Sequence, residues 1–490
     1  NGIDFQDLSG SSVLPVNNVG RIELAIAPSD ANYAYASIVS NMGKLRGIYQ
    51  SKDGGETWTS IAAGGGYQFE PFAYSSSVYG QGVYDNALGV SLNDPEKIFV
   101  GGIRLYSWSS SEGWNKIAST SLSDISYYVH ADMHWVEPHP TNPDIIYFAN
   151  DGGIFKTFNG GETFTQLTHG YATLQMYAIA VSDSGDVMGG TQDNGTHYVD
   201  YKQRTNTSSK KLLGGDGGYA SFSMIRPEVF FASYQYPSLM RSINWGESFN
   251  HFWDENISPD GEDPDGSFVT PYILWEDKGG FLIDSSSSLS MPSKPDTLTN
   301  NVIVNVSVDT IFDPSVMYYG VNNAIWMTRE VMRFDKIPVW YKVANTTGDC
   351  ESIAVSSDGD IVWAGTGNYA VNGRLYRIKG LRNANYGYID NSQIKYLIND
   401  TSSLDTFYYI DSDFDHDRAG IEVTKMISPL GTETWGKVVT AVAIDPSDPS
   451  HVIVGLGNYD GTLDHIYESV NALDSMPVFT SILSRKLAAL

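Results

Sequence analysis

The chain has 490 residues, which is long for one ordinary domain and suits either two domains or one array of repeats. Its composition favours β structure, with 48 glycines, 31 tyrosines and 11 tryptophans against only 18% charged residues. A formal charge of −27 argues against nucleic-acid binding, because such a surface repels phosphate backbones. No run approaches the roughly 18 apolar residues of a membrane-spanning helix, and a single cysteine, Cys350, leaves no intrachain disulfide.

Short apolar runs separated by Pro, Asp and Asn turns follow one another along the chain, and each pair is typical of strand, tight turn and strand. Few stretches show helical periodicity over more than two turns. Grouping the runs gives blade-like units near residues 19–64, 81–120, 129–170, 174–214, 216–257, 268–345, 350–410 and 437–484. The first five have the usual size of a four-stranded blade, roughly 40 residues. Residues 411–436 fit no unit, and we expect a loop there.

One octet recurs three times after such runs, with the pattern Ser/Thr-x-Asp/Asn-x-Gly-x-Ser/Thr-aromatic. We expect each copy to form a hairpin turn, because an Asp or Asn side chain can fold back onto backbone N–H groups and glycine supplies a positive φ. The terminal aromatic residue would pack between neighbouring sheets. The pattern positions are Ser51, Asp53, Gly55 and Trp58 in the first copy, Thr157, Asn159, Gly161 and Phe164 in the second, and Ser242, Asn244, Gly246 and Phe249 in the third.

The octet resembles the Asp-box of sialidases and of the wider sialidase-like, BNR-repeat β-propellers. This resemblance implies an all-β fold, a propeller of seven or eight four-stranded blades that stands alone or forms part of a two-propeller protein. Asp-boxes lie on the rim of a propeller, so they indicate the fold and say little about catalysis. A true sialidase is not favoured, since Arg21 is followed by Ile22 and Glu23 rather than by Ile-Pro, and no trio of arginines stands in convincing contexts.

The densest group of chemically active side chains lies in the third to fifth units. His130, Asp132 and His134 alternate in sequence, so on a strand they would share one face. Aspartates beside glycines recur in this region and are Asp151, Asp193 and Asp216. Because glycine allows close approach of the backbone and these aspartates recur once per unit, we expect them at one mouth of the central channel.

These residues admit a structural, a metal-binding and a catalytic interpretation. The structural interpretation, which we favour, makes them hydrogen-bonding residues of inner strands and caps of turns. In the second, His130, Asp132 and His134 bind a transition metal such as zinc, with Asp151 or Asp193 as a further ligand, or the glycine-flanked carboxylates hold Ca²⁺. In the third, a pair drawn from Asp132 and the glycine-flanked aspartates hydrolyses glycosides, one acid being protonated and the other ionised.

The phrases of this region also resemble, in order, those of a large group of secreted BNR-repeat or sialidase-like proteins common in Bacteroidota. The shared phrases are Asp-x-His, Asn-Asp-Gly-Gly, Gly-Thr-Gln-Asp-Asn-Gly and Gly-Asp-Gly-Gly, and the match is good over residues 130–245. The resemblance implies an extracellular or cell-surface protein that meets the type IX secretion machinery in transit, and it implies no particular reaction. Since the chain opens at Asn1 without Met, we expect it to be part of a longer secreted protein.

Alternating acids at Asp411, Asp413 and Asp415 resemble a calcium loop, but His416 stands where an EF-hand needs glycine. We predict an acidic solvated loop there.

We therefore expect an extracellular binding or scaffold propeller, with a glycan or a surface protein as partner, or a subunit of a larger secreted assembly. The ion that it would bind is left open between calcium and another metal, and no nucleic acid and no membrane span are expected. The alternative is an Asp-box-type glycoside hydrolase that acts on polysaccharide with an Asp pair. Carboxyl groups about 5–5.5 Å or 6.5–9.5 Å apart in an open cleft would favour the enzyme, and aspartates tied to backbone N–H groups would favour the scaffold.

Overall fold

The computed structural model describes residues 13–64, 69–74, 77–121, 123–170, 173–203, 209–251, 265–277, 315–335, 338, 340–368, 370–382, 384, 395–397, 407–409, 420–457 and 464–482. Within these ranges the strands form eight four-stranded antiparallel sheets and one two-stranded sheet. The named helical element is the short 3₁₀ turn η1 (Tyr201–Gln203). The predicted fold class is confirmed, because the chain is all-β and built from four-stranded sheets of the propeller type. Among the described residues, no helix has the length and apolar character that a membrane crossing would need.

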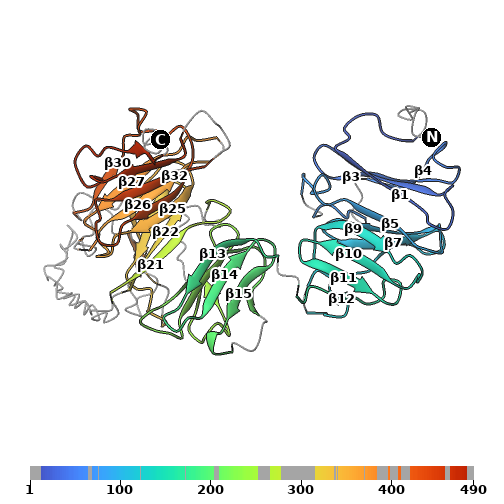
Figure 1. The fold of residues 1–490 in the computed structure, drawn as a ribbon, viewed down its shortest axis with the longest axis horizontal. Helices are drawn as coiled ribbons and strands as arrows, with labels where there is room; N and C mark the ends of the chain where they lie inside the picture. Colours follow the sequence, from blue (N-terminus) through green and yellow to red (C-terminus); the bar gives the residue numbers. More distant parts are fainter. Residues whose placement is uncertain are drawn as a thin grey trace, which may run out of the picture. The chain divides into compact units, whose positions relative to one another are not determined.

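The chain divides into two compact units, and the first, Asn1–Thr173, contains three sheets (Figure 1). In each sheet the strands lie in chain order, joined by short hairpins. The first sheet contains β1 (Arg21–Ile26), β2 (Ala34–Val39), β3 (Leu45–Ser51) and β4 (Thr59–Ala63). The second contains β5 (Ala87–Val90), β6 (Lys97–Gly101), β7 (Leu105–Ser109) and β8 (Gly113–Lys116). The third contains β9 (Met133–Pro138), β10 (Ile146–Asn150), β11 (Gly153–Thr157) and β12 (Thr165–Gln166).

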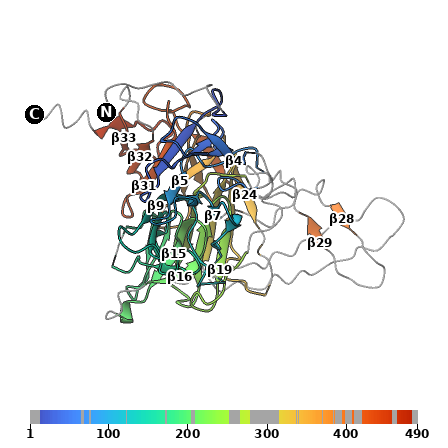
Figure 2. The same ribbon diagram turned by 90° about the vertical axis from the view of Figure 1, so that its right-hand side faces the viewer.

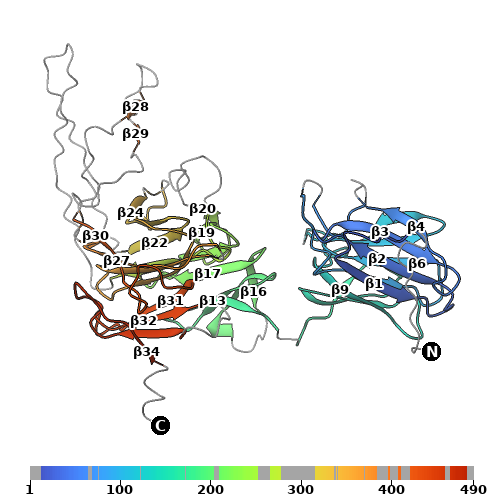
Figure 3. The same cartoon turned by 90° about the horizontal axis from the view of Figure 1, so that it is seen from above.

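The second unit, Leu174–Leu490, contains five four-stranded sheets (Figures 1 and 3). The fourth sheet of the chain contains β13 (Met176–Val181), β14 (Val187–Thr191), β15 (Gly195–Val199) and β16 (Lys210–Leu213). The fifth contains β17 (Gly217–Phe222), β18 (Phe230–Tyr234), β19 (Leu239–Ser242) and β20 (Asn250–His251). The sixth contains β21 (Tyr272–Glu276), β22 (Ser315–Val321), β23 (Ala324–Thr328) and β24 (Tyr341–Asn345). The seventh contains β25 (Cys350–Val355), β26 (Val362–Thr366), β27 (Leu375–Lys379) and β30 (Glu422–Lys425), and the eighth contains β31 (Val439–Ile444), β32 (Val452–Leu456), β33 (Ile466–Ser469) and β34 (Thr480–Ser481). A separate hairpin consists of β28 (Lys395–Leu397) and β29 (Phe407–Tyr409) (Figure 2).

The interpretation of residues 411–436 as a loop outside any blade is wrong. The strand β30 lies within this range and pairs with β27, where Lys425 stands opposite Tyr376. A long insertion separates the third and fourth strands of the seventh sheet, so a grouping by even spacing could not assign β30 to its sheet. The acidic run Asp411–Asp417 lies outside the described residues.

Within each unit, consecutive sheets share hydrophobic cores because alternate residues of a strand point to opposite faces. On β22, Tyr318 packs with Val362 of the seventh sheet, and its neighbour Tyr319 packs with Phe231 of the fifth. Phe99 on β6 likewise faces the third sheet. Strands buried on both faces explain the apolar runs in the sequence, such as the fully buried β22.

The octets form the turns between the third and fourth strands of three sheets. In the first copy, Ser51 Oγ accepts the Gly55 N–H at 2.8 Å, and Asp53 Oδ1 accepts the Thr57 N–H at 2.8 Å. The donors on Thr57 lower the pKa of Asp53 to about 2. The same two bonds recur at 2.9–3.0 Å in the second and third copies. Each turn ends directly before the fourth strand, at Trp58, Phe164 and Phe249.

A fourth turn of this kind lies between β33 and β34, where the pattern is interrupted. Ser469 Oγ donates to Asn471 Oδ1, and Asn471 Oδ1 accepts the Val478 N–H at 3.0 Å. Phe479 follows and is buried. The acceptor and donor residues are seven positions apart here and four apart in the other copies, so the sequence pattern missed this turn.

Candidate functional site

The first unit gathers its polar side chains around the loop that precedes β5. The guanidinium of Arg21 on β1 donates to the carbonyls of Tyr84 at 2.7 Å and Asn86 at 3.2 Å. Ser37 Oγ in turn donates to the buried side chain of Asn86 at 2.7 Å. These bonds attach the loop to the first sheet, and they therefore hold the backbone of Tyr84 and its neighbours in a fixed position.

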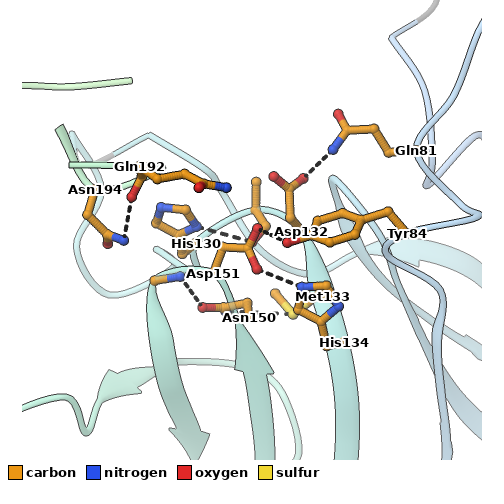
Figure 4. Close-up of polar contacts among 12 residues, drawn as sticks. Gln81, Tyr84, His130, Asp132, Met133, His134, Asn150, Asp151, Gln192 and Asn194 are labelled. Carbon is orange, nitrogen blue, oxygen red and sulfur yellow. Dashed lines mark hydrogen bonds and ion pairs between the residues drawn. The ribbon is translucent and has the colours of Figure 1, made fainter. Parts of the chain in front are cut away.

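Asp132 lies in the segment that leads into β9, and its backbone adopts the left-handed conformation with φ of 61°. Gln81 Nε2 donates to Asp132 Oδ1 at 3.2 Å (Figure 4). The prediction that His130, Asp132 and His134 share one face of a strand is wrong. The strand begins only at Met133, and the positive φ at Asp132 breaks the extended alternation that the prediction assumed.

Asp151 stands in the turn between β10 and β11 and is held from two sides. His134 Nε2 donates to Asp151 Oδ1 at 2.6 Å, and the Tyr84 hydroxyl donates to Oδ2 at 2.9 Å (Figure 4). The rings of Tyr84 and His134 meet edge to face with centroids 4.7 Å apart. Asp151, His134 and Tyr84 therefore form one hydrogen-bonded group that connects three chain segments.

The glycines of the Asn-Asp-Gly-Gly phrase have separate roles. A Cβ atom added to Gly152 would lie 2.4 Å from the ring of His130, so only glycine leaves room for this imidazole. Gly153 has a φ of 113°, which favours glycine. The Asn150 side chain accepts the Gly152 N–H at 3.1 Å and closes the turn.

Asp85 is a member of this group that the sequence did not single out. It is fully buried, and no N–H or O–H of the described residues donates to either of its carboxyl oxygens. Burial, followed by the charge of Asp132, raises the pKa of Asp85 to about 9, and burial also raises the pKa of Asp132. Burial and the neighbouring carboxyl group of Asp132 both disfavour the ionised form of Asp85.

A positional signal could have identified Asp85. Acids stand one or two residues before the first strand of several sheets, directly ahead of an apolar run: Asp85, Asp132, Asp216 and Asp349. Glycine neighbours drew attention to Asp216, whereas Asp85 stands between Tyr84 and Asn86.

In the second unit, Asp193 and Asp216 are tied into turns. The backbone N–H of Asp193 donates to Asp216 Oδ1 at 2.8 Å, and the backbone N–H of Asp216 donates to Gln235 Oε1 at 2.9 Å. Asp193 also has a positive φ of 60°. Each unit therefore has its own group of aspartates: Asp85, Asp132 and Asp151 in the first and Asp193 and Asp216 in the second.

One ring nitrogen of each histidine considered as a transition-metal ligand is engaged within the protein. The imidazole of His134 bonds Asp151, and Nδ1 of His130 lies 3.1 Å from the carbonyl of Ala131. The oxygen atoms of Asp132 and Asp151 remain as ligand types for a hard cation, and one carboxylate oxygen of each lies within 4.8 Å of the other.

Comparison with known proteins yields likenesses of fold. No protein-family model matches the chain, and no curated protein matches it. Among solved structures, PorZ, a surface component of the type IX secretion system of Porphyromonas gingivalis, is similar with 13% identity and a TM-score of 0.39, over 96% of this chain and 51% of that one. A GH74 xyloglucanase from Xanthomonas campestris has 12% identity and a TM-score of 0.24, over 94% and 60%. A GH74 enzyme from Niastella koreensis has 14% identity and a TM-score of 0.23, over 95% and 78%.

The chain spans about half the length of PorZ and 60% of the xyloglucanase. Identities and TM-scores this low support no conclusion about what the chain binds or catalyses, so the function has to be argued from its own residues.

Proposed function

We propose that the chain is an extracellular or cell-surface binding propeller that recognises a glycan through the first unit. The observation that carries the proposal is the group formed by Tyr84, His134 and Asp151. The residue Tyr84 is 52% exposed, while its hydroxyl donates to Asp151 and its ring packs in a T-shaped arrangement with that of His134. An exposed ring in a fixed orientation beside carboxylates is a suitable platform for a sugar.

The chemistry of sugars explains this choice. The C–H face of a sugar ring stacks on an aromatic side chain, and its hydroxyl groups donate to carboxylates. Tyr84 supplies the aromatic face, and Asp132 supplies a half-buried carboxylate positioned by Gln81. Trp135, which is 57% exposed on β9, adds a second exposed aromatic residue to the same unit.

Binding is a better account than hydrolysis. A glycosidase needs one protonated acid that reaches the glycosidic oxygen and one ionised carboxylate that acts as base or nucleophile. Asp85 has the raised pKa of such an acid, but its side chain is fully buried. Asp151 has both oxygens engaged by Tyr84 and His134. Asp85 and Asp151 therefore do not form an exposed pair of acid and base.

We further propose that the protein belongs with the secreted Asp-box proteins and acts as an adhesin-like module or as a subunit of a larger surface assembly. The support is the octet turn with its repeated hydrogen bonds, and the order of the Asp-x-His and Asn-Asp-Gly-Gly phrases. A calcium ion and a surface-protein partner are both compatible with the strongly acidic composition.

A glycan array tests the proposal. The wild-type chain is expected to bind a defined set of glycans, and Tyr84→Ala is expected to weaken this binding at least tenfold because it removes the stacking surface. Tyr127→Ala is the matched control, since Tyr127 is also exposed, at 47%, and lies outside the group. Asp132→Ala and Asp193→Ala compare the two units. Equal binding by Tyr84→Ala, Asp132→Ala and the wild type would refute the assignment of the site to the first unit.

A further inference from the structure

The first unit places the carboxyl groups of Asp85 and Asp132 against each other. Asp85 and Asp132 form no ion pair with Lys or Arg among the described residues. Arg21 on β1, which bonds this loop, is engaged by backbone carbonyls and by Glu23. The cationic group that the described residues place on this cluster is the imidazole of His134, which bonds Asp151 and carries a full charge only when protonated.

The carboxyl group of Asp85 is the most unusual part of this cluster. The side chain is completely buried, and neither oxygen receives a hydrogen bond from the described chain. Its own backbone N–H donates to the carbonyl of Gln81 at 3.0 Å. The carboxyl of Asp85 lies against that of Asp132. A buried carboxyl group with no donor, directed at a second carboxyl group, is an uncommon arrangement that calls for a positively charged occupant.

We propose that Asp132 and Asp151, with Asp85 buried against Asp132, form a binding site for a divalent cation that prefers oxygen ligands, with Ca²⁺ as the expected ion. The facing oxygens of Asp132 and Asp151 lie within 4.8 Å of each other. Two ligands that are each about 2.3–2.6 Å from one calcium ion span this separation. Asp85 places a third carboxyl group beside them, buried against Asp132. This site does not depend on glycan binding and would exist in a pure scaffold as well.

The hydrogen bonds around the cluster favour a hard cation over zinc. The Nε2–H of His134 donates to Asp151 and orients this carboxylate, whose oxygen atoms are the ligand type that hard cations prefer. Tyr84 fixes the other oxygen of Asp151, and Gln81 fixes Asp132. Calcium tolerates irregular geometry and fills its remaining positions with water or a ligand's hydroxyl groups.

Thermal unfolding of the full chain, stripped with EDTA and titrated with CaCl₂, tests the site. Because an ion that binds only the native state stabilises it, we expect the unfolding midpoint to rise with CaCl₂ and to saturate, while NaCl at equal ionic strength has no such effect. Calorimetry should then give an affinity that falls at least tenfold in Asp132→Asn, Asp151→Asn and Asp85→Asn. Asp124→Asn is the matched control, since Asp124 is an exposed acid of the same unit.

Two outcomes would overturn the proposal. One is a wild-type midpoint that responds to CaCl₂ no more than to NaCl, with no heat of binding for CaCl₂ or MnCl₂. The other is calcium binding by Asp132→Asn and Asp151→Asn at the strength of Asp124→Asn. Circular dichroism shows whether Asp85→Asn folds. If it does not fold, the calcium affinities of Asp132→Asn and Asp151→Asn, compared with that of Asp124→Asn, still test the proposal.

Discussion

The guanidinium of Arg21 donates to the carbonyl of Tyr84, 2.7 Å away, and so ties β1 to the loop that carries the side chains of the site. The same guanidinium also reaches Glu23 and the carbonyl of Asn86. In a sialidase, an arginine at this early position would clamp a substrate carboxylate. Here its donors are used by the protein itself, which makes it a structural residue.

Arg21→Ala should therefore loosen the loop without touching a ligand. We expect a loss of about 1–2 kcal/mol in the free energy of unfolding, since the carbonyls of Tyr84 and Asn86 lose a charged donor. Glycan binding should weaken in parallel. Denaturant unfolding measures the loss, and Arg46→Ala, a change at an exposed arginine of β3, serves as control. An unchanged free energy of unfolding would mean that the loop is held by Asn86 alone.

Two substitutions of Asp53 test how much the third residue of the octet stabilises its turn. Asp53→Asn should be almost neutral, because Asn159 in the second copy accepts the Thr163 N–H in the same way and donates its amide to the Thr163 hydroxyl. Asp53→Ala should cost about 1–2 kcal/mol, since the Thr57 N–H and hydroxyl lose their acceptor. Chemical denaturation of both variants checks this order. If both changes cost the same, the hydrogen bonds do not stabilise the turn.

Gly152 tests the packing of the site. Gly152→Ala places a Cβ atom 2.4 Å from the His130 ring, so either the ring or the turn must move. We expect a loss of about 1–3 kcal/mol in stability together with weaker ligand binding. Gly214→Ala is the matched control, because a Cβ atom there meets no other atom within 4 Å. Equal midpoints for the two variants in thermal unfolding would contradict the close contact.

A pH dependence follows from Glu351 in the second unit. Burial, followed by the charge of Asp349, raises the pKa of Glu351 to about 7 from an ordinary value of 4.5. The native state therefore keeps a proton that the unfolded chain releases. This contribution to stability is complete below pH 4.5 and is lost as the pH rises to about 7.

Glu351→Gln removes this titration. The unfolding midpoint of the wild type should fall by a few degrees relative to the variant between about pH 5 and pH 7. Parallel midpoint curves for the two proteins across this range would show that Glu351 titrates normally.

The sequence predicted the features that local patterns determine. Four-stranded sheets follow from apolar runs at regular spacing, and the octet turns follow from residues that contact one another within eight positions. The strand β30 and the interrupted turn at Asn471 were missed, because insertions change the spacing on which the pattern depends.

The candidate site was predicted only in part. Asp132, His134 and Asp151 were identified by their sequence phrases, and the hydrogen bond from His134 to Asp151 spans only 17 positions. The hydrogen bond from Tyr84 to Asp151 spans 67 positions, so no local pattern could reveal it. Asp85 carried no motif, and its importance comes from burial, which depends on the packing of the second and third sheets.

The most direct test of the central claim measures binding and turnover in one experiment. The purified chain is incubated with insoluble preparations of xyloglucan, mannan and sialylated mucin, after which the pellet is assayed for protein and the supernatant for reducing ends. We predict that at least one polysaccharide retains the wild type but not Tyr84→Ala, with no reducing ends above the protein-free blank. Reducing ends that the wild type releases and Asp132→Asn does not would contradict the account and identify a glycoside hydrolase.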